Sequence, residues 1–374
     1  MSGFSAFDHA CMTEALRLAE RGLWTTDPNP RVGCVIARED RIVGRGWHQR
    51  AGGPHAEVFA LREAGEAARG ATAYVTLEPC AHHGRTPPCA EALVAAGVER
   101  VAVAAHDPFP EVDGRGSERL RAAGIEVEHG LLQDQARELN IGFFSRIERG
   151  RPWLRLKLAS SLDGRTGLAN GESKWITGEA ARADVQRWRA RSSAVMTGSA
   201  TVRADDPALT ARVDAELAAP VRIVVCGEGG VPIGARLLAD GLAPVWLAGP
   251  KGSLAELPRC EQIELPAAER GVDLSALLMT LGERGINELQ VECGARLAGA
   301  LLRGGWVDEL LLYQAPCVLG SGARPLFDDI DLTAMMQRFR FETVDRRFLG
   351  DDLRWRLRPL SDHQRPEETP CSPD

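Results

Sequence analysis

The sequence lacks several features that would mark a membrane, exported or fibrous protein. It has no run of about 18 consecutive apolar residues, so we expect no transmembrane helix. Residues 1–8 show no basic segment followed by an apolar core, so we predict no secretory signal. There is no fixed-period repeat and no low-complexity block, and 44% hydrophobic with 26% charged residues is ordinary for a globular protein. For 374 residues we therefore expect two or three globular domains in the cytoplasm.

Positive charge is also in short supply. Lys and Arg total 45 against 52 for Asp and Glu, which gives a net charge of −7. A net negative protein gains no general electrostatic attraction for polyanions, so we do not expect nucleic acid as a partner, although a local basic pocket stays possible. The nine cysteines are odd in number and scattered, which is not the pattern of a disulfide framework. We therefore expect free thiols in a reducing compartment.

Predicted strands and helices alternate through the first 148 residues. Asp8 is a candidate cap for a helix that stops at Gly22, and residues 32–37 and 41–44 read as a hairpin. Further strands are predicted at 73–77, 101–104 and 125–127, and helices at 56–68, 89–96, 117–123 and 133–145. This alternation predicts an α/β sandwich with partly parallel strands.

A second α/β series follows the short charged turn 149–152. Its predicted strands are 153–158, 194–196, 221–226, 245–247, 288–291 and 309–313, its helices 179–191, 273–282 and 295–303, and its closing hairpin 338–344 with 353–357. We therefore predict one domain over 1–148, a second over 149–360, and a disordered polar tail over 361–374.

Three potential zinc ligands and one carboxylate occur in an order that is typical of zinc deaminases. His55-Ala56-Glu57 begins a predicted helix, Cys80 follows a predicted strand, and Cys89 opens a helix behind two prolines. A zinc deaminase holds its metal with one His and two Cys, leaves the fourth place to water, and moves protons with a carboxylate that is not a ligand. We therefore predict one zinc per chain on His55, Cys80 and Cys89. Zinc would lower the pKa of bound water from about 15.7 to about 7, and Glu57 would carry a proton to the leaving ammonia.

Simpler interpretations of these residues exist. His55 could be an ordinary surface histidine and the cysteines could be core residues. A structural zinc module joined to a ligand-binding sensor domain is a further alternative, but structural sites normally close all four places with protein ligands. The spacing also departs from the general Pro-Cys-x-x-Cys pattern, because eight residues separate Cys80 and Cys89 and bring His82, His83 and Arg85 close to the metal.

With that long insert, residues 74–89 resemble the bifunctional riboflavin-biosynthesis deaminase–reductases, as do residues 53–57, 29–33 and 44–48. The resemblance implies a cytidine-deaminase-like α/β/α sandwich that deaminates 2,5-diamino-6-ribosylamino-4(3H)-pyrimidinone 5′-phosphate. It also implies substrate contacts from four residues: Asn29, His48, His82 and Arg85. An arginine suits a phosphate, and an asparagine offers a donor and an acceptor to a ring edge, although Asn29 could equally be a turn former.

Two positions depart from that family's pattern. Ala81 stands where the family usually has Ser, and Phe109 stands where it often has Asn. Both bear on how the substrate is contacted and leave the zinc ligands untouched.

The second half has no Gly-x-Gly-x-x-Gly after a strand, so a standard Rossmann fingerprint is absent. Residues 291–300 instead read as a strand, a glycine turn and a helix, whose first N–H groups could hold a phosphate or simply form a turn. Residues 157–165, 171–177 and 198–210 resemble the same family's reductase domain, which is similar to dihydrofolate reductase and uses NADPH.

That resemblance implies two sets of contacts. Contacts to NADPH are expected from Ala159, Trp175, Thr201, Asp205, Gly294, Ala295, Arg296, Leu297, Ala298, Gly299 and Ala300. Contacts to the substrate are expected from Ser173, Arg189, Leu209, Arg212 and Glu292. The residue types agree in part, because Arg189 and Arg212 could clamp a phosphate, although surface salt bridges would be a plainer role. Trp175 could stack on a ring or sit in the core, and Asp163 could orient a ligand or pair with Lys157.

The preferred interpretation is a bifunctional enzyme that deaminates the pyrimidine and then reduces the ribosyl group of the product to ribityl. The alternative is a nucleotide or tRNA zinc deaminase with an unrelated appended nucleotide-binding domain. The negative net charge weakly disfavours tRNA as a substrate. We also expect a homo-oligomer, a dimer or a tetramer, because exposed sheet edges in such two-domain enzymes often pair.

Overall fold

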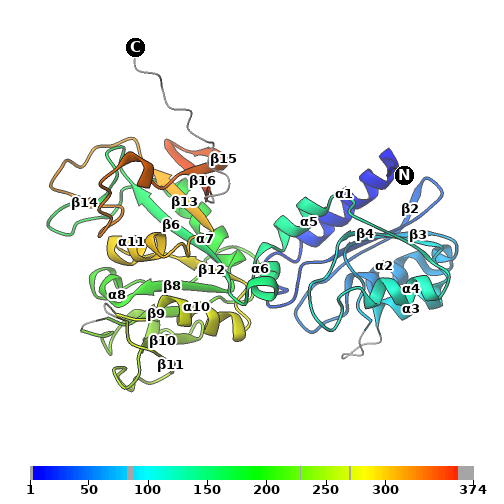
Figure 1. Ribbon diagram of the computed structural model, residues 1–374, viewed down its shortest axis with the longest axis horizontal. Helices are drawn as coiled ribbons and strands as arrows, with labels where there is room; N and C mark the ends of the chain where they lie inside the picture. The colour runs from blue at the N-terminus through cyan, green and yellow to red at the C-terminus, as the bar shows by residue number, and fades with distance from the viewer. Residues whose placement is uncertain (1–2, 82–87, 228, 269–270, 361–374) are drawn as a thin grey trace, which may run out of the picture. The chain divides into compact units, whose positions relative to one another are not determined.

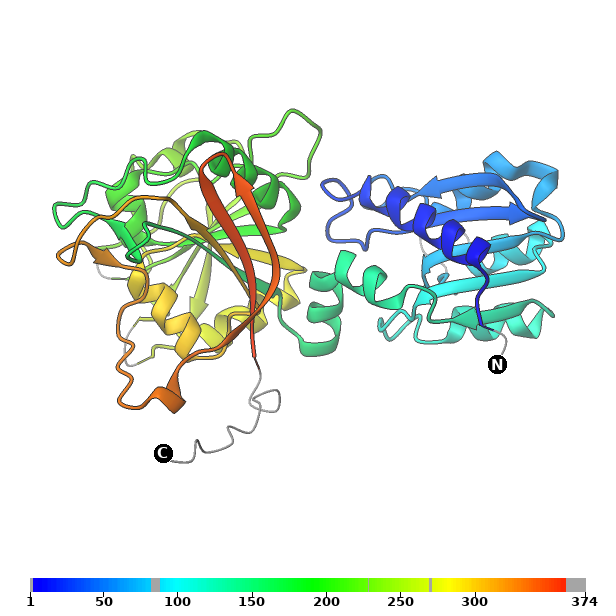
Figure 2. The same ribbon diagram turned by 90° about the horizontal axis from the view of Figure 1, so that it is seen from above.

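A computed structural model describes residues 3–81, 88–227, 229–268 and 271–360 (Figures 1 and 2). The chain divides into two compact units, the first built mainly from residues up to Pro152 and the second mainly from residues beyond it. Two short segments, Asp214–Ala218 and Leu278–Glu288, group with the first unit. The domain limits expected at 148 and 360 stay predictions, and the predicted tail 361–374 lies outside the described residues.

The first unit is built on a five-stranded sheet in the order β2-β1-β3-β4-β5. Its strands are β1 (Gly33–Arg38), β2 (Arg41–Trp47), β3 (Thr72–Leu77), β4 (Arg100–Ala105) and β5 (Glu126–His129). Its helices are α1 (Ala6–Glu20), α2 (Ala56–Ala64), the 3₁₀ turn η1 (Gly65–Ala68), α3 (Cys89–Ala96), α4 (Arg115–Ala122), α5 (Gln133–Leu139) and α6 (Ile141–Arg149). Strand β1 runs antiparallel to β2 and β3, whereas β3, β4 and β5 are parallel, which confirms the predicted partly parallel α/β sandwich.

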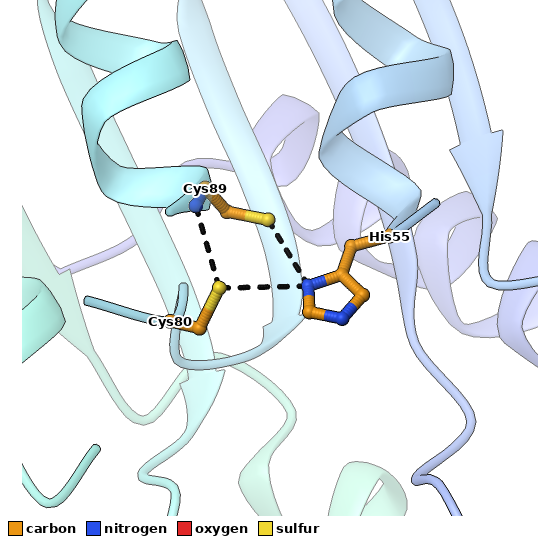
Figure 3. Close-up of side chains that lie close together, drawn as sticks. All are labelled: His55, Cys80 and Cys89. Atoms are coloured by element: carbon orange, nitrogen blue, oxygen red, sulfur yellow. Dashed lines mark hydrogen bonds between the residues drawn. The ribbon is translucent and has the colours of Figure 1, made fainter. Parts of the chain in front are cut away.

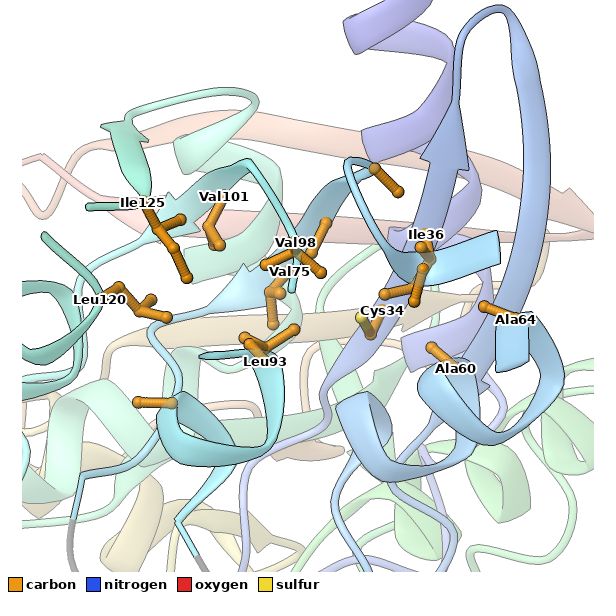
Figure 4. Close-up of a cluster of buried hydrophobic side chains, with 14 of the residues drawn as sticks. Cys34, Ile36, Ala60, Ala64, Val75, Leu93, Val98, Val101, Leu120 and Ile125 are labelled. Carbon is orange, nitrogen blue, oxygen red and sulfur yellow. The ribbon is translucent and has the colours of Figure 1, made fainter. Parts of the chain in front are cut away.

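Each face of this sheet has its own apolar layer. Cys34 and Ile36 point to the layer covered by α2, α3 and α4, which also contains Val75 and Leu93 (Figure 4). The neighbouring residue Val35 points to the opposite layer, which α1 and α5 cover. Successive side chains of a strand alternate between the two faces of a sheet, so a strand with both faces covered is apolar throughout.

Several helix limits differ from the prediction, and the cause of two of these differences is clear. Helix α1 is capped by Ser5, and Asp8 is its third residue, where the two side chains and backbones form a reciprocal capping box. The helix predicted over 133–145 is two helices, α5 and α6, separated at Asn140. The Asn140 side chain accepts the N–H of Arg31 at 2.8 Å and donates to its carbonyl at 2.9 Å, so a long-range contact determines where the first helix ends.

The second unit is built on a nine-stranded sheet in the order β11-β10-β9-β8-β12-β6-β13-β16-β15. Its strands are β6 (Trp153–Ser160), β8 (Ala194–Gly198), β9 (Val221–Val225), β10 (Val245–Pro250), β11 (Cys260–Leu265), β12 (Glu288–Val291), β13 (Glu309–Gln314), β15 (Phe341–Leu349) and β16 (Asp352–Pro359), with the small pair β7 (Arg165–Gly167) and β14 (Arg324–Pro325). Its helices are α7 (Glu179–Arg191), α8 (Ser199–Asp205), α9 (Arg236–Ala239), α11 (Ala295–Arg303) and the 3₁₀ turn η2 (Met335–Gln337). Helix α10 (Leu274–Glu283) begins in this unit, and its residues from Leu278 onward group with the first unit.

The strands of this sheet are mostly parallel. Strands β12, β8, β9, β10 and β11 pair in parallel in turn, and β13 is parallel to β6. The predicted closing hairpin is confirmed as β15 and β16, which pair antiparallel. Strand β11 was not predicted, because half of its residues are polar and it lies at the sheet edge. Among the described residues, no helix is long and apolar enough to cross a membrane.

Candidate active sites

The predicted zinc ligands come from three separate elements and meet at one point (Figure 3). His55 is the N-cap residue of α2 and Cys89 is the first residue of α3. Cys80 lies in the loop after β3. In the metal-free protein the hydrogen bond to Cys80 and burial raise the pKa of the Cys89 thiol, so metal binding at this helix start would release its proton.

The spacing of the ligand atoms suits a tetrahedral zinc ion. The Nδ1 atom of His55 lies 3.2 Å from Sγ of Cys89 and 3.5 Å from Sγ of Cys80. All three ligand atoms lie within 4.8 Å of one another. Zinc–nitrogen bonds of about 2.0 Å and zinc–sulfur bonds of about 2.3 Å separate tetrahedral ligands by about 3.5 Å, so the donors present fit zinc without rearrangement.

Local hydrogen bonds prepare Cys80 for metal binding. The Cys89 thiol lowers the pKa of Cys80 to about 4, with further contributions from His55 and from the backbone N–H of Cys89. That N–H donates to Sγ of Cys80 at 3.3 Å. The thiolate is the form that binds a metal, so Cys80 is already in its ligand state at neutral pH.

Glu57 stands beside the ligands in the first turn of α2 and is only 3% exposed. Burial raises its pKa, in spite of the nearby His55. Glu57 and His55 line a cavity of about 270 Å³ together with Asn29, His48 and Cys80. A carboxyl group with a raised pKa is suited to accept and return a proton near neutral pH.

Asn29 and His48 form a short hydrogen-bonded chain on the wall of this cavity. His48 is 2% exposed, and its Nδ1–H donates to the carbonyl of Pro54 at 3.0 Å. Its Nε2 accepts from Nδ2 of Asn29 at 3.2 Å. Burial lowers the pKa of His48, so the ring is neutral and orients the Asn29 amide toward the cavity.

The cavity also contains residues that were not predicted. Asp107 is 7% exposed, lines the cavity, and accepts the N–H of Phe109 at 2.9 Å. Burial raises the pKa of Asp107 to about 6. Arg146 lines the cavity as well. The sequence analysis had singled out Phe109, two residues after Asp107, as a departure from the family pattern, and Phe109 also lines the cavity. The predicted contacts His82 and Arg85 lie outside the described residues.

In the second unit, the predicted NADPH contacts follow the carboxyl ends of parallel strands. Helix α8, which carries Thr201 and Asp205, directly follows β8, and Gly294 lies three residues after β12. Because β8 and β12 are parallel, both loops lie at one edge of the sheet, where α/β proteins bind their ligands. A Leu297 methyl group approaches Gly198 at the end of β8, 3.9 Å from the position that a Cβ would take.

Arg189 and Glu292, both predicted to contact the substrate, bind each other. Arg189 donates from Nε and Nη2 to the two carboxylate oxygens at 2.6 and 2.8 Å, and its Nη1 donates to the Thr210 carbonyl at 3.0 Å. The side chains are 11% and 14% exposed. Arg212 is exposed and its backbone N–H binds Gln186. The described contacts thus tie Arg189 to the protein, whereas the Arg212 guanidinium is accessible.

The remaining predicted residues differ in exposure. Ala159 and Ser173 are half-buried, and Leu209 is buried with a left-handed φ of 52°. Trp175 is 70% exposed with the Arg182 guanidinium 4.6 Å from its ring centroid, so it is no core residue. Ala295 and Ala300 are half-buried, whereas the side chain of Arg296 is 91% exposed.

Two residues of the 294–300 stretch pack inward. Ala298 is fully buried, and a Cβ on Gly299 would lie 2.0 Å from the Asp328 carbonyl oxygen. Asp163 accepts the N–H groups of Leu319 and Gly320 at 3.1 and 2.8 Å, so it ties two loops together.

Comparison with known proteins agrees with this geometry. The family model of the cytidine and deoxycytidylate deaminase zinc-binding region matches residues 5–105, and that of the RibD C-terminal domain matches residues 152–350. The riboflavin biosynthesis protein RibD of Escherichia coli (strain K12) is 50% identical over 361 residues, covering 92% of this chain and 98% of the relative. The corresponding protein of Haemophilus influenzae is 46% identical, covering 96% and 99%.

Solved structures show the same likeness. Acinetobacter baumannii RibD (form 1) has 49% identity and a TM-score of 0.88, covering 95% of this chain and 99% of that chain. A Thermotoga maritima diaminohydroxyphosphoribosylaminopyrimidine deaminase/5-amino-6-(5-phosphoribosylamino)uracil reductase has 32% identity and a TM-score of 0.84 with the same coverage. The chain therefore belongs to the RibD family of bifunctional riboflavin-biosynthesis enzymes, with a zinc-dependent deaminase domain and an NADPH-dependent reductase domain.

Proposed function

We propose that the first unit deaminates 2,5-diamino-6-ribosylamino-4(3H)-pyrimidinone 5′-phosphate on a zinc ion held by His55, Cys80 and Cys89. The second unit then reduces the ribosyl group of the product to ribityl with NADPH. One observation carries the deaminase assignment, namely the cluster of three ligand atoms within 4.8 Å beside the buried Glu57. The name of the Thermotoga relative describes these two reactions. The alternative of an unrelated second domain is set aside, because the RibD C-terminal model matches residues 152–350.

In the deaminase, this chain's residues position the ring and move the protons. A zinc ion held by His55, Cys80 and Cys89 would lower the pKa of its bound water and so provide a hydroxide at neutral pH. Glu57 takes the proton of the attacking water and passes it to the departing ammonia. Asn29, held by His48, presents its amide oxygen to an N–H of the pyrimidine ring, and His48 closes that wall of the cavity. In the same proposal, His82 and Arg85 hold the ribose and phosphate.

In the reductase, NADPH supplies the hydride, and the protein supplies position and electrostatics. We place its contacts at Ala159, Trp175, Thr201, Asp205 and residues 294–300, and those of the substrate at Ser173, Arg189, Leu209, Arg212 and Glu292. The shared carboxyl edge of β8 and β12 supports this placement. The exposed Arg212 is suited to the phosphate, and Arg189 acts by holding Glu292 in place.

A mass-spectrometric assay of the purified chain with the diaminopyrimidine phosphate tests both activities. Without NADPH, we expect a product in which one amino group has become a carbonyl, with ammonia released. With NADPH, the same product should gain two hydrogens. Reduction of the substrate without prior loss of ammonia would contradict the proposed order.

The Glu57→Gln variant tests the proton carrier. We expect it to keep one zinc per chain and to lose deaminase turnover by about 10²–10⁴-fold, because the amide cannot accept the proton. Reductase turnover on the deaminated substrate should stay at the native rate and serves as the control for folding of the chain. Metal analysis that finds no zinc in an active native enzyme would overturn the mechanism.

We further propose that the enzyme is a cytoplasmic homo-oligomer, a dimer or a tetramer, that binds no nucleic acid. All eight cysteines among the described residues are free, which suits a reducing compartment. Strand β15 ends the large sheet, and Phe348 on it is 79% exposed. Val344 on the same strand is exposed too, and the segment that precedes the strand in sequence has the exposed apolar side chains Leu332, Met335, Met336 and Phe339. A free strand edge that carries exposed apolar side chains is a typical site for strand pairing, here with a second copy of this chain.

A further inference from the structure

Glu78 lies between the end of β3 and the zinc ligand Cys80, and its side chain is completely buried. It accepts the N–H of Gly114 at 3.2 Å and that of Ser117 at 3.0 Å. The Ser117 hydroxyl donates to it at 2.9 Å, and Nδ1 of His106 lies 2.7 Å from its second oxygen. A buried carboxylate is costly to leave unpaired, so this full set of partners indicates a defined role.

These hydrogen bonds supply a helix cap that α4 does not have of its own. The N-cap residue of α4 is Gly114, whose φ is 85° and which has no side chain with which to accept an N–H. The first N–H groups of a helix have no partner inside the helix, and they favour a negative charge. Glu78 therefore caps α4 from a different element, which links the end of β3 to the start of that helix.

The next residue, Pro79, is held from the same helix. A Cβ on Gly116 would lie 1.8 Å from the carbonyl oxygen of Pro79, so only glycine allows α4 to approach this closely. The first turn of α4 thus contacts both residues: it donates hydrogen bonds to Glu78 and packs directly against Pro79. The chain then leads straight to Cys80.

The three zinc ligands differ in how the fold supports them. His55 caps α2 and Cys89 is the first residue of α3, so a helix carries each of them. Cys80 belongs to no helix or strand. We propose that Glu78 is a positioning residue, which fixes Cys80 by capping α4 and so determines how tightly the zinc site holds its metal. This inference rests on the proposed zinc ligands and adds a residue, itself in the wall of the same cavity, that acts on the metal through the position of Cys80.

The test measures the rate of zinc loss from the full-length, zinc-loaded protein to a coloured chelator. Glu78→Gln keeps the size of the side chain but places an amide NH₂ against helix N–H donors. We expect it to release zinc about 10-fold faster or more, the range typical of groups that support a metal ligand. Ser117→Ala removes one donor to Glu78 and should give a smaller increase. Cobalt-substituted Glu78→Gln should show an altered thiolate-to-cobalt absorption band.

Asp8→Asn is the matched control. Asp8 is also buried and also accepts an N–H at the start of a helix of the same unit, α1, whose N-cap is Ser5. Its other partners are Tyr74 and Arg100, and it does not bind residues 78–79 before Cys80. We expect its zinc-release rate to match the native protein, even where its melting temperature falls as much as that of Glu78→Gln. Such a result separates ligand positioning from a general loss of stability.

Each outcome decides a different claim. Equal zinc-release rates in native protein, Asp8→Asn and Glu78→Gln overturn the role of Glu78. If Glu78→Gln does not fold, as judged by its unfolding curve, a native release rate and native cobalt spectrum in Ser117→Ala overturn it instead. A native chain that binds no zinc overturns the proposed function, whereas a zinc-binding native chain with unaltered variants overturns this inference alone.

Discussion

At the scale of single residues, Glu292 shows how a nearly buried carboxylate stays ionised. Burial by itself would raise its pKa, but the charge and the two hydrogen bonds of Arg189 lower it to about 2 from an ordinary value of 4.5. Gln290 adds a further hydrogen bond at 2.7 Å. The negative charge is therefore present at the reductase site under all physiological conditions.

This pair makes the stability of the second unit depend on pH. The pKa of Glu292 is lower in the folded state than its ordinary 4.5, so the pair stabilises fully above that value and less as the pH falls toward 2. Arg189→Ala should cost about 3–5 kcal/mol at pH 7, since it leaves Glu292 without its partner. In the variant, the free energy of unfolding should also fall less steeply as the pH drops below 4.5, because Glu292 no longer has a lowered pKa. Urea unfolding at several pH values measures both effects, and parallel pH curves for native and variant proteins would disprove the coupling.

The same Arg189→Ala variant shows whether Arg189 supports substrate binding or only the stability of the fold. Because Arg189 orients Glu292, we expect Arg189→Ala to raise the KM for the phosphorylated substrate more than the KM for NADPH. Steady-state reductase kinetics with each substrate varied in turn measure the two constants. Equal weakening of both would show that the arginine is purely structural.

At the scale of elements, contacts distant in sequence decide where helices end and how closely they pack. Asn140 separates α5 from α6 because its side chain satisfies both backbone groups of Arg31, a partner 109 residues away. Gly299 lets the Asp328 backbone lie directly on α11. Asn140 thereby holds the backbone of Arg31, whose neighbours Pro30 and Val32 line the deaminase cavity, and Gly299 lies in the helix that follows the glycine turn at Gly294.

Asn140→Ala should destabilise the first unit by about 2–4 kcal/mol, because two buried backbone groups of Arg31 lose their partners. Urea unfolding of the full chain measures the loss. Gln135→Ala, an exposed position on the same α5, is the control and should change stability by less than about 0.5 kcal/mol. A loss in Asn140→Ala no larger than this control would contradict the role given to the contact.

Gly299→Ala should raise the KM for NADPH and leave deaminase turnover at the native value. The added methyl group would lie 2.0 Å from the Asp328 carbonyl oxygen, so the Asp328 backbone must move. Because the Asp328 N–H donates to the carbonyl of Ala295, the start of α11 must move with it. Gly322→Ala is the control, because a Cβ there meets nothing within 4 Å. An unchanged KM for NADPH in Gly299→Ala would remove this helix from the proposed cofactor site.

At the scale of the whole molecule, the free edge of β15 is where we expect copies of the chain to meet. Acidic Glu342 and basic Arg347 lie on the same strand, so an antiparallel pairing of two copies centred between Val344 and Asp345 sets Glu342 of one copy opposite Arg347 of the other. The exposed Phe348 lies at the end of the same strand. A second copy would cover both the strand edge and the exposed Phe348.

Phe348→Asp should shift the protein toward the monomer, since it places a charge on the strand that a second copy would bury. Sedimentation velocity over a range of concentrations measures the shift. Ile233→Asp alters another side chain of similar exposure, 75% against 79%, away from β15 and should leave the association state as it is. A native protein that stays monomeric at all concentrations would end this proposal.

The sequence alone determined the chemistry of the deaminase. His55, Glu57, Cys80 and Cys89 could be assigned because zinc chemistry demands those residue types, and each lies where a local pattern begins a helix or ends a strand. The alternation of strands and helices was equally visible, because apolar periodicity depends on neighbouring residues.

Only the tertiary structure decided how these residues are held. The cap that Glu78 places on α4 spans 36–39 residues, and the pair of Arg189 with Glu292 spans 103. The break at Asn140 has the same origin. A carboxylate or an amide can accept from many donors, so its residue type does not name its partner. That partner follows from which segments the packed core brings together, and no local pattern in the chain contains this information.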